Sequence, residues 1–181
     1  MIRIIGGKHR SRMIQTPSSE IVLPTKNMVR EALFSILGRS VVNAAVLDLF
    51  AGSGALGLEA LSRGASKAFF CDSHPEPIRI LTDNIKTLKE EGRAEVHHCD
   101  YNEMINYLEN NEILVDITFV DPPYESGYYD AVIERMLASK AFKSGGKIII
   151  ESRHEIANYI LKNHESRQYR YGQTHLLIVT K

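Results

Sequence analysis

The chain has 181 residues, of which 44% are hydrophobic and 24% are charged, so it is long enough for one soluble domain with a substantial core. No apolar run approaches the roughly 18 residues that a membrane span requires, and the opening residues lack the apolar core of a signal peptide. We therefore expect a cytoplasmic protein with no membrane partner.

The formal net charge of zero conceals an uneven distribution. Residues 1–30 contain six Lys or Arg and one Glu, residues 31–139 contain eight basic and eighteen acidic residues, and residues 140–181 contain eight and three. Basic ends around an acidic body are typical of an enzyme that modifies nucleic acid, because phosphate contacts dominate nucleic-acid affinity. The two cysteines, Cys71 and Cys99, share no ligand spacing with the histidines, so we expect buried thiols and neither a disulfide nor a metal site.

The N-terminal segment predicts a small basic extension. Residues 2–16 alternate apolar and basic character around a glycine-containing turn at 6–10, which indicates a hairpin that must lean on the main domain. Its cationic side chains are candidates for phosphate contacts: Arg3, Lys8, Arg10 and Arg12.

A linker and a helix follow the hairpin. Thr25 can cap a helix over residues 26–37, whose apolar stripe is Met28, Val29, Ala32, Leu33, Ile36 and Leu37. Arg30 lies off that stripe and is expected on the surface, and both Thr25 and Arg30 lie where the start of a helix can line a pocket and contact RNA. We expect residues 1–40 to form an RNA-contacting extension and pocket lid, and residues 41–181 to form the catalytic domain.

Residues 45–57 carry the most informative pattern, a short buried strand followed by a glycine-rich turn and a helix. Gly52 and Gly54 allow a tight turn close to a ligand, and Gly57 allows the helix to pack closely on the sheet. The spacing also matches a dinucleotide fingerprint, with Asp72 at about the expected 20 residues further on. Asp48, inside the strand end, would oppose a pyrophosphate. It suits a cationic ligand such as the ammonium and sulfonium of S-adenosylmethionine.

Two further strands are predicted to end in acids. Asp72 ends a strand over 67–72, where a carboxylate can accept hydrogen bonds from ribose hydroxyls, or can cap the helix that follows. Asp100 ends a strand over 95–100, where it can meet an adenine amino group or serve only as a helix cap.

A fourth strand over 116–120 delivers Asp121-Pro122-Pro123-Tyr124. Consecutive prolines predict a rigid loop with exposed carbonyl groups. Asp121 and the Pro122 carbonyl can accept both hydrogens of an exocyclic amine, while Tyr124 stacks on a flipped base. Such a site would accelerate methyl transfer mainly by orienting the amine.

The rest of the chain completes an α/β pattern. Helices are predicted over 55–63, 77–90, 104–109, 127–138 and 155–162, a strand over 147–151 after Gly145-Gly146, and a terminal hairpin over 168–171 and 174–180. The prediction is a Rossmann-like fold with a seven-stranded, mostly parallel sheet closed by a C-terminal antiparallel hairpin.

Several segments together resemble a known family. The Asp48 to Gly57 segment and Asp121 to Tyr124 resemble class I methyltransferases acting on exocyclic amines. The segments 3–8, 24–25 with 29–34, and 56–65 are similar to the bacterial 16S ribosomal RNA guanine-N2 methyltransferases of the RsmD type. The resemblance implies methylation of a guanine N2 in small-subunit ribosomal RNA, within a partly assembled particle. It also implies cofactor binding by the following residues: Asp48, Phe50, Ala51, Gly52, Ser53, Gly54, Asp72 and Asp100. Asp121 and Tyr124 would hold the guanine. One departure is Cys71-Asp72-Ser73, where relatives commonly carry Glu with an Asp two residues later, so the ribose acceptor is shorter here.

Other functions use parts of the same pattern. An adenine-N6 or cytosine-N4 DNA methyltransferase would use the same loop, but the chain has no separate domain to read a DNA sequence. A dinucleotide-dependent oxidoreductase is opposed by Asp48 and the proline loop, and a noncatalytic RNA-binding protein by the intact loop. We expect a monomer.

Overall fold

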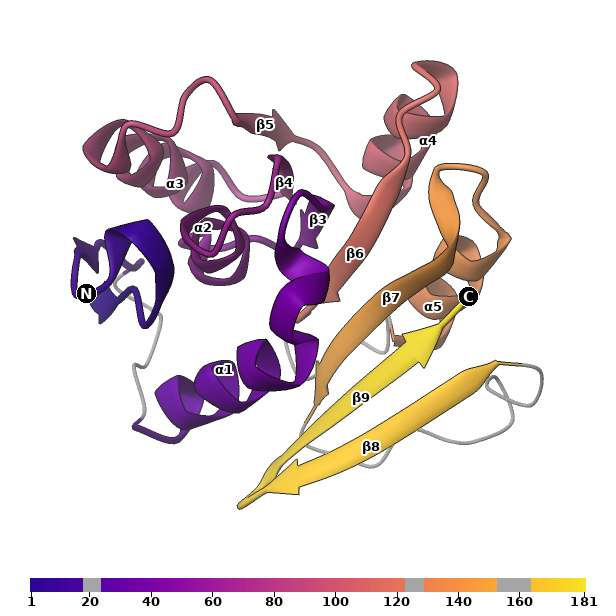
Figure 1. The fold of residues 1–181 in the computed structure, drawn as a ribbon. Coiled ribbons are helices and arrows are strands. Elements are labelled where there is room, and N and C mark those ends of the chain that lie inside the picture. Colours follow the sequence, from indigo (N-terminus) through magenta and orange to yellow (C-terminus); the bar gives the residue numbers. More distant parts are fainter. Residues whose placement is uncertain (18–23, 123–128, 153–163) are drawn as a thin grey trace.

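The computed structural model describes residues 1–17, 24–122, 129–152 and 164–181, and these form an α/β fold around one large sheet (Figure 1). The sheet has seven strands in the order β5-β4-β3-β6-β7-β9-β8. Strands β3 to β7 pair in parallel, while β9 pairs antiparallel with both β7 and β8. This arrangement confirms the predicted Rossmann-like sheet with its C-terminal hairpin.

The strands of this sheet are β3 (Ala45–Leu49), β4 (Lys67–Asp72), β5 (Ala94–His98), β6 (Val115–Val120), β7 (Phe142–Ser152), β8 (Glu165–Tyr171) and β9 (Thr174–Thr180). The helices are α1 (Pro24–Leu37), α2 (Ala55–Ser62), α3 (Pro75–Leu88), α4 (Tyr101–Asn110) and α5 (Tyr129–Ala138), with a short 3-10 turn, η2 (Gly38–Val41), after α1. The helix predicted over 155–162 lies outside the described residues. No described helix has the length and apolarity to cross a membrane.

Helices cover both faces of the sheet because the buried strands are apolar on both faces. On one face, Val46 of β3 and Phe70 of β4 join a core with residues of α1, α2 and α3. On the other face, Leu47 and Leu49 of β3 pack in a second core with residues of α4 and α5. The chain changes direction between β3 and β6, so the crevice beyond their carboxyl ends is a topological switch point, the usual ligand site of open α/β sheets.

Three local predictions were wrong. The strand predicted over 147–151 is longer, because a register shift between Val115 and Ile117 lets β7 accommodate Gly145 and Gly146 within the strand. In α1, Met28 and Ile36 are exposed while Phe34 is buried, so the helix presents a face rotated from the predicted stripe. The helix also begins at Pro24, so Thr25 lies within it and does not precede it as a cap.

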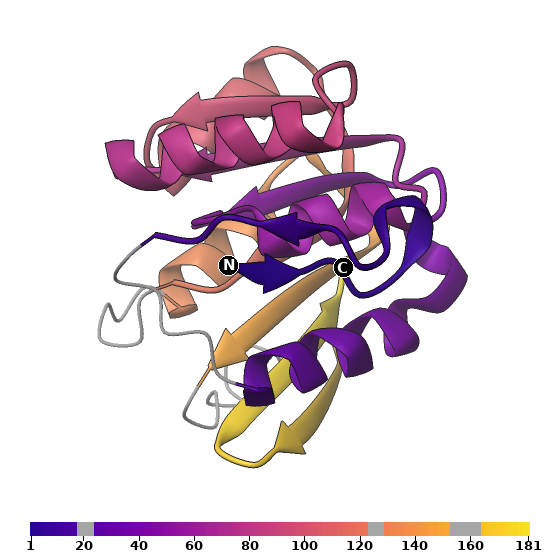
Figure 2. The ribbon, with the colours of Figure 1, turned by 90° about the vertical axis from the view of Figure 1, so that its left-hand side faces the viewer.

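The N-terminal hairpin forms as predicted and packs on the helical layer (Figure 2). Strands β1 (Ile2–Arg3) and β2 (Met13–Ile14) pair antiparallel, and the short 3-10 turn η1 (Gly7–His9) lies at the tip. The backbone N–H groups of Ile5 and Gly6 donate to the two carboxylate oxygens of Glu59 in α2, at 2.7 and 2.8 Å. Hydrogen bonds to a buried carboxylate therefore attach the hairpin to the sheet domain.

Glu90 forms a second attachment beyond the end of α3. Lys8 contacts its carboxylate at 2.7 Å and Arg93 at 2.7 Å, and His9 also bonds to it. Burial opposes ionisation of Glu90, but the hydrogen bonds from Lys8, His9 and Arg93 outweigh it and lower the pKa of the carboxyl group. The basic tip is thus neutralised in part by the protein itself.

Gly57 of α2 packs closely against Phe70 of β4, and its replacement by alanine is expected to destabilise the fold. A Cβ there would lie 2.2 Å from Cε1 of Phe70, a fully buried ring. Overpacking of this kind costs about 1–3 kcal/mol. Thermal unfolding of Gly57→Ala checks this, with Gly92→Ala as the matched control, because a Cβ at Gly92 meets nothing within 4 Å. Equal melting temperatures for the two variants would contradict the close packing.

Candidate active site

Three carboxylates gather at the carboxyl edge of the central strands. Asp48 lies near the end of β3, Asp72 ends β4, and Asp121 follows β6 directly. Asp48 is 2% exposed. Burial, and then the charges of Asp121 and Asp72, raise the pKa of Asp48 well above its usual value, against the lowering effect of a hydrogen bond from Gly57. The edge therefore has an excess of negative charge that a cation would relieve.

The glycine turn is held in place by two of these acids. Gly57 donates its N–H to Asp48 at 2.8 Å, and Gly52 donates to Asp72 at 2.9 Å. Gly52 and Gly54 have φ values of 53° and 80°, which favour glycine. A Cβ on Gly52 would meet nothing within 4 Å, so the backbone of this turn is open to a ligand.

A cavity of about 250 Å³ lies beside the turn, at the ends of β4 and β5. It is lined by Phe50, Cys71, Asp72, Ser73, Cys99, Asp100, Tyr101 and Asn102. Phe50 has the left-handed φ of 62°, which is rare for a bulky residue, and its ring lies 6.0 Å from that of Tyr101. Ser73, Tyr101 and Asn102 were not predicted to line the site, although each lies directly after one of two predicted strands, where ligand-binding residues of such sheets are found.

Asp72 and Asp100 each make local hydrogen bonds in addition to lining the cavity. Asp72 accepts from the N–H of His74 at 2.9 Å. The N-cap position of α3 is held by His74 and not by Asp72. Asp100 is the N-cap of α4 and forms a capping box with Glu103. The capping role that the sequence left open for Asp100 is therefore present.

Cys71 and Cys99 are both free thiols, as predicted, and they lie on neighbouring strand ends in this cavity. Only Cys71 is buried. The hydrogen bond with Cys99 and then burial raise the pKa of the Cys71 thiol. No group of three or more His, Cys, Asp or Glu among the described residues could hold a metal ion.

The proline loop is described only at its beginning. Asp121 is half-buried and Pro122 is buried, directly beyond the end of β6. Leu49, the last residue of β3, pairs with Cys71 of β4 on one side and with Val120 of β6 on the other. Asp72 and Asp121 directly follow these two partners, so they lie on either side of Phe50, the residue after β3. Tyr124 lies outside the described residues, and so does the side chain of Thr25.

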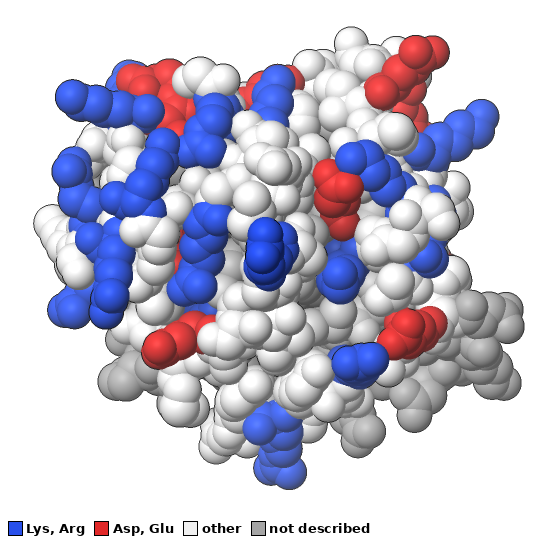
Figure 3. Space-filling model, viewed as in Figure 1, with Lys and Arg blue, Asp and Glu red and all other residues white. Residues whose placement is uncertain are grey.

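Four of the predicted RNA-contacting cations, Arg3, Lys8, Arg10 and Arg12, lie on the hairpin, and Arg30 bonds to the hairpin from α1. Helices α2 and α3 return from the carboxyl edge to the amino edge of the sheet, and the hairpin tip is attached at their ends: His9 donates its N–H to Ser62 at 2.9 Å, and Lys8 pairs with Glu90. The tip therefore lies at the amino edge, away from Asp121. Lys and Arg side chains gather over the hairpin and α3 in the view of Figure 3.

Arg30 contradicts the expectation of a surface residue, because it is 6% exposed. Its guanidinium donates to the carbonyl of Arg3 at 2.6 Å and to the side chain of Asn27 at 3.1 Å. Arg12 donates to the carbonyl of Thr87 at 3.1 Å, while Arg3 and Arg10 are exposed. Arg30 thus joins α1 to the hairpin.

Asn84 was missed by the sequence reasoning because it resembles an ordinary helix residue. It is buried in α3, accepts the N–H of Gln15 at 2.8 Å and donates to the carbonyl of Gln15 at 2.9 Å. It also donates to the carbonyl of Ser53 at 2.9 Å. This side chain therefore joins the end of the hairpin to the glycine turn.

Comparisons with solved structures agree with the fold. A hypothetical protein of Thermus thermophilus superposes with a TM-score of 0.83 at 29% identity, covering 100% of both chains. The 16S rRNA N2 G1207 methyltransferase of T. thermophilus, solved with AdoMet and guanosine, superposes with a TM-score of 0.69 at 23% identity, over 92% of this chain and 45% of that one. At this identity the second likeness shows the fold alone.

Comparisons of sequence identify the family. Residues 2–180 match the family described as Conserved hypothetical protein 95. The ribosomal RNA small subunit methyltransferase D of Escherichia coli K12 is 38% identical over 154 residues, covering 85% of this chain and 76% of that protein. The protein of the same name from Haemophilus influenzae is 33% identical over 152 residues, covering 83% and 78%. The chain therefore belongs to this family, the RsmD family of methyltransferases.

Proposed function

We propose that this chain transfers a methyl group from S-adenosylmethionine to the exocyclic N2 of a guanine in small-subunit ribosomal RNA, free or within an assembling particle. The observation that carries the proposal is that Asp48, Asp72, Asp121, the glycine turn and a cavity all lie at one edge of the sheet. The names of the RsmD relatives support ribosomal RNA as the substrate. The sheet domain from residue 41 carries the chemistry, and residues 1–40 contact the RNA.

The cavity fits the nucleoside part of S-adenosylmethionine, the cofactor of this family. The open side of Gly52 lets the ligand approach the backbone. Asp72 can accept from ribose hydroxyls while keeping the Gly52 hydrogen bond, because each carboxylate oxygen offers two lone pairs. Asp100 would face the adenine amino group, and the Phe50 and Tyr101 rings line the same space. Phe50, Ala51, Ser53 and Gly54 shape the turn around it.

Asp48 acts on the cofactor through its charge and through the turn. Its Oδ2 already accepts the Gly57 N–H, so it holds the start of α2 against the sheet. The cationic ammonium and sulfonium of the cofactor would favour ionisation of a carboxyl group whose pKa is raised in the free protein. A pyrophosphate would add a like charge at this edge, which opposes a dinucleotide.

The reaction then depends on orienting the amine. The cofactor supplies an electrophilic methyl group on its sulfonium. The Asp121 carboxylate and the Pro122 carbonyl would accept the two hydrogens of the guanine amine, which would turn the nitrogen lone pair toward the methyl group, and Tyr124 would stack on the base. As the new N–C bond forms, the S–C bond of the sulfonium would break, S-adenosylhomocysteine would leave, and one amine proton would pass to solvent. Most of the acceleration comes from this positioning.

Asp48→Asn is expected to stabilise the cofactor-free chain at pH 8 and to weaken S-adenosylmethionine binding about tenfold. The folded protein holds a proton on Asp48 at pH values above the usual pKa of 3.8, so the ionisable carboxyl costs stability as the pH rises through that window. The neutral amide removes this cost, and a gain of about 1 kcal/mol would raise the melting temperature by about 2–4 °C. Melting curves and calorimetry check both effects. The stability gain should shrink at pH 5. An Asp48→Asn variant less stable than wild type at pH 8, or one with wild-type affinity for S-adenosylmethionine, would contradict the proposed role of Asp48 in binding the cationic cofactor.

Methyl transfer tests the proposed function. The protein is incubated with methyl-labelled S-adenosylmethionine and small-subunit particles from cells lacking this gene, and the labelled nucleoside is identified by digestion and mass spectrometry. Label in N2-methylguanosine is expected. Label in N6-methyladenine, N4-methylcytosine or DNA would refute the guanine assignment, and absence of transfer from a protein that binds the cofactor would refute the activity on these particles.

A further inference from the structure

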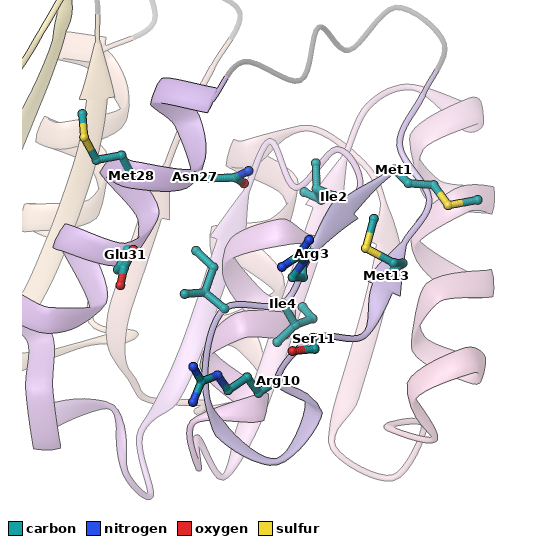
Figure 4. A pocket seen from close by; sticks show the side chains of 11 residues that line it. Met1, Ile2, Arg3, Ile4, Arg10, Ser11, Met13, Asn27, Met28 and Glu31 are labelled. Atoms are coloured by element: carbon teal, nitrogen blue, oxygen red, sulfur yellow. The ribbon is translucent and has the colours of Figure 1, made fainter.

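A second and larger cavity, of about 540 Å³, lies between the N-terminal hairpin and the first turns of α1 (Figure 4). Arg3 and Arg10 line it from the hairpin side, and Asn27 and Glu31 line it from α1. We call this the hairpin groove. None of its lining residues belongs to the cofactor cavity.

The hairpin groove extends toward the edge of the sheet that carries Asp121. Gln15, two residues after the groove residue Met13, is bonded to Asn84, which also bonds to Ser53 of the glycine turn. The carboxyl end of α1 leads through η2 to the amino end of β3, so it lies at the amino edge of the sheet. Asn27 and Met28, in the first turns of α1, lie at the opposite end of the helix, nearer the carboxyl edge. The Asn27 end of the groove therefore lies on the side of the carboxyl edge, where Asp121 follows β6.

The two arginines of the groove differ from the other cations of the hairpin. Lys8 pairs with Glu90 and Arg12 donates to Thr87, whereas neither the Arg3 nor the Arg10 guanidinium bonds to any side chain or carbonyl in the part of the chain that the structure describes. Both residues are exposed. They can thus offer planar donor groups to phosphate oxygens without breaking an internal contact.

The hairpin groove is lined both by exposed methionine side chains and by polar side chains of α1. Met1, Met13 and Met28 are 72%, 46% and 50% exposed, and all three line it. Flexible thioethers adapt to flat, irregular apolar partners such as base faces. On the α1 wall the Glu31 carboxylate would repel a phosphate, but it can accept a hydrogen bond from a base amine.

We propose that the hairpin groove binds the single-stranded RNA next to the target guanine, with its phosphates on Arg3 and Arg10 and a base turned toward Asn27 and Glu31. This inference rests on the proposed function, because it names the place of the RNA beside the same active site. Arg3 and Arg10 then contribute more to RNA binding than Lys8 of the hairpin tip, which pairs with Glu90.

The double variant Arg3→Ala/Arg10→Ala tests the phosphate contacts. Its KM for the small-subunit particle should rise about tenfold, with kcat and the KM for S-adenosylmethionine within about twofold of wild type. The dependence of log(1/KM) on log salt should become shallower by about 1.4, the value for two contacts to a single strand. If Arg3 and Arg10 only stabilised the hairpin, their removal would not change this salt dependence. The matched control, Lys140→Ala/Arg167→Ala, removes two exposed cations from other elements and should leave the slope unchanged.

A photoreactive p-benzoylphenylalanine in place of Glu31 identifies the occupant. Crosslinks to ribosomal RNA within a few nucleotides of the methylated guanine are expected. Crosslinks only to a ribosomal protein, crosslinks to distant nucleotides, or an unchanged salt slope in an enzyme that still methylates guanine would overturn the groove assignment while leaving the proposed function intact. A wild-type protein that methylates no guanine would overturn both.

Discussion

Replacing Asp121 by asparagine is expected to lower kcat for guanine methylation by on the order of 10²–10³-fold, with the dissociation constant for S-adenosylmethionine changed less than about threefold. Asp121 follows β6 directly and lies near enough to Asp48 for its charge to raise the pKa of that residue. An amide in its place can present a donor to an amine that needs an acceptor. The orientation of the nitrogen lone pair would then be lost, although the cofactor cavity at β4 and β5 would remain intact.

Single-turnover transfer with labelled cofactor measures this effect. Asp116→Asn is the matched control, because Asp116 lies near the start of β6, the strand that Asp121 follows. There it accepts from the N–H of Ala45 at 2.8 Å and from Lys143 at 2.7 Å. It should retain methyl transfer close to the wild-type rate. If Asp121→Asn were as active as Asp116→Asn, Asp121 would have no role in holding the amine.

Glu59→Ala is expected to cause the largest loss of stability, about 3–5 kcal/mol, and to release the hairpin from α2. The Glu59 side chain is fully buried and accepts from the N–H groups of Ile5 and Gly6 and from Arg63 at 2.7 Å. Truncation leaves two partly buried backbone donors without their acceptor and a guanidinium without its partner. The hairpin groove would then lose one of its walls.

Thermal unfolding and hydrogen exchange at Ile5 and Gly6 measure this release. The melting temperature should fall by roughly 6–20 °C, since each kcal/mol corresponds to about 2–4 °C in a domain of this size. Glu91→Ala removes an exposed carboxylate close to Glu90 and should leave both quantities unchanged. Slow exchange at Ile5 and Gly6 in Glu59→Ala would show that other contacts hold the hairpin.

The sheet and the glycine turn could be predicted because their signals are local. The apolar run over 45–49, the glycines that follow it and the acid at 48 lie within a few residues of one another, and parallel order follows from alternation of strands and helices. The extra length of β7 was not predicted, because a Gly-Gly pair is typical of a turn. Only the pairing of β7 with β6 shows that the strand continues through Gly145 and Gly146.

The surroundings of the cations could not be predicted from the sequence, because their partners are distant in the chain. Arg30 was expected on the surface, but its acceptor is a carbonyl of β1, 27 residues away. Lys8 was expected to be available to RNA, but Glu90 lies beside it only once α3 has been placed against the hairpin. Asp100 illustrates the converse, since the sequence already allowed both a cap and a ligand contact and the structure shows the cap.

The most direct measurement of the site is the crystal structure of the chain with S-adenosylhomocysteine bound. The adenosine is predicted to lie in the cavity lined by Phe50, Asp72 and Tyr101, with the ribose hydroxyls on Asp72 and the sulfur directed toward Asp121. A nucleoside bound in the hairpin groove, or a sulfur directed away from the end of β6, would contradict the assignment of the carboxyl edge as the place where cofactor and guanine meet.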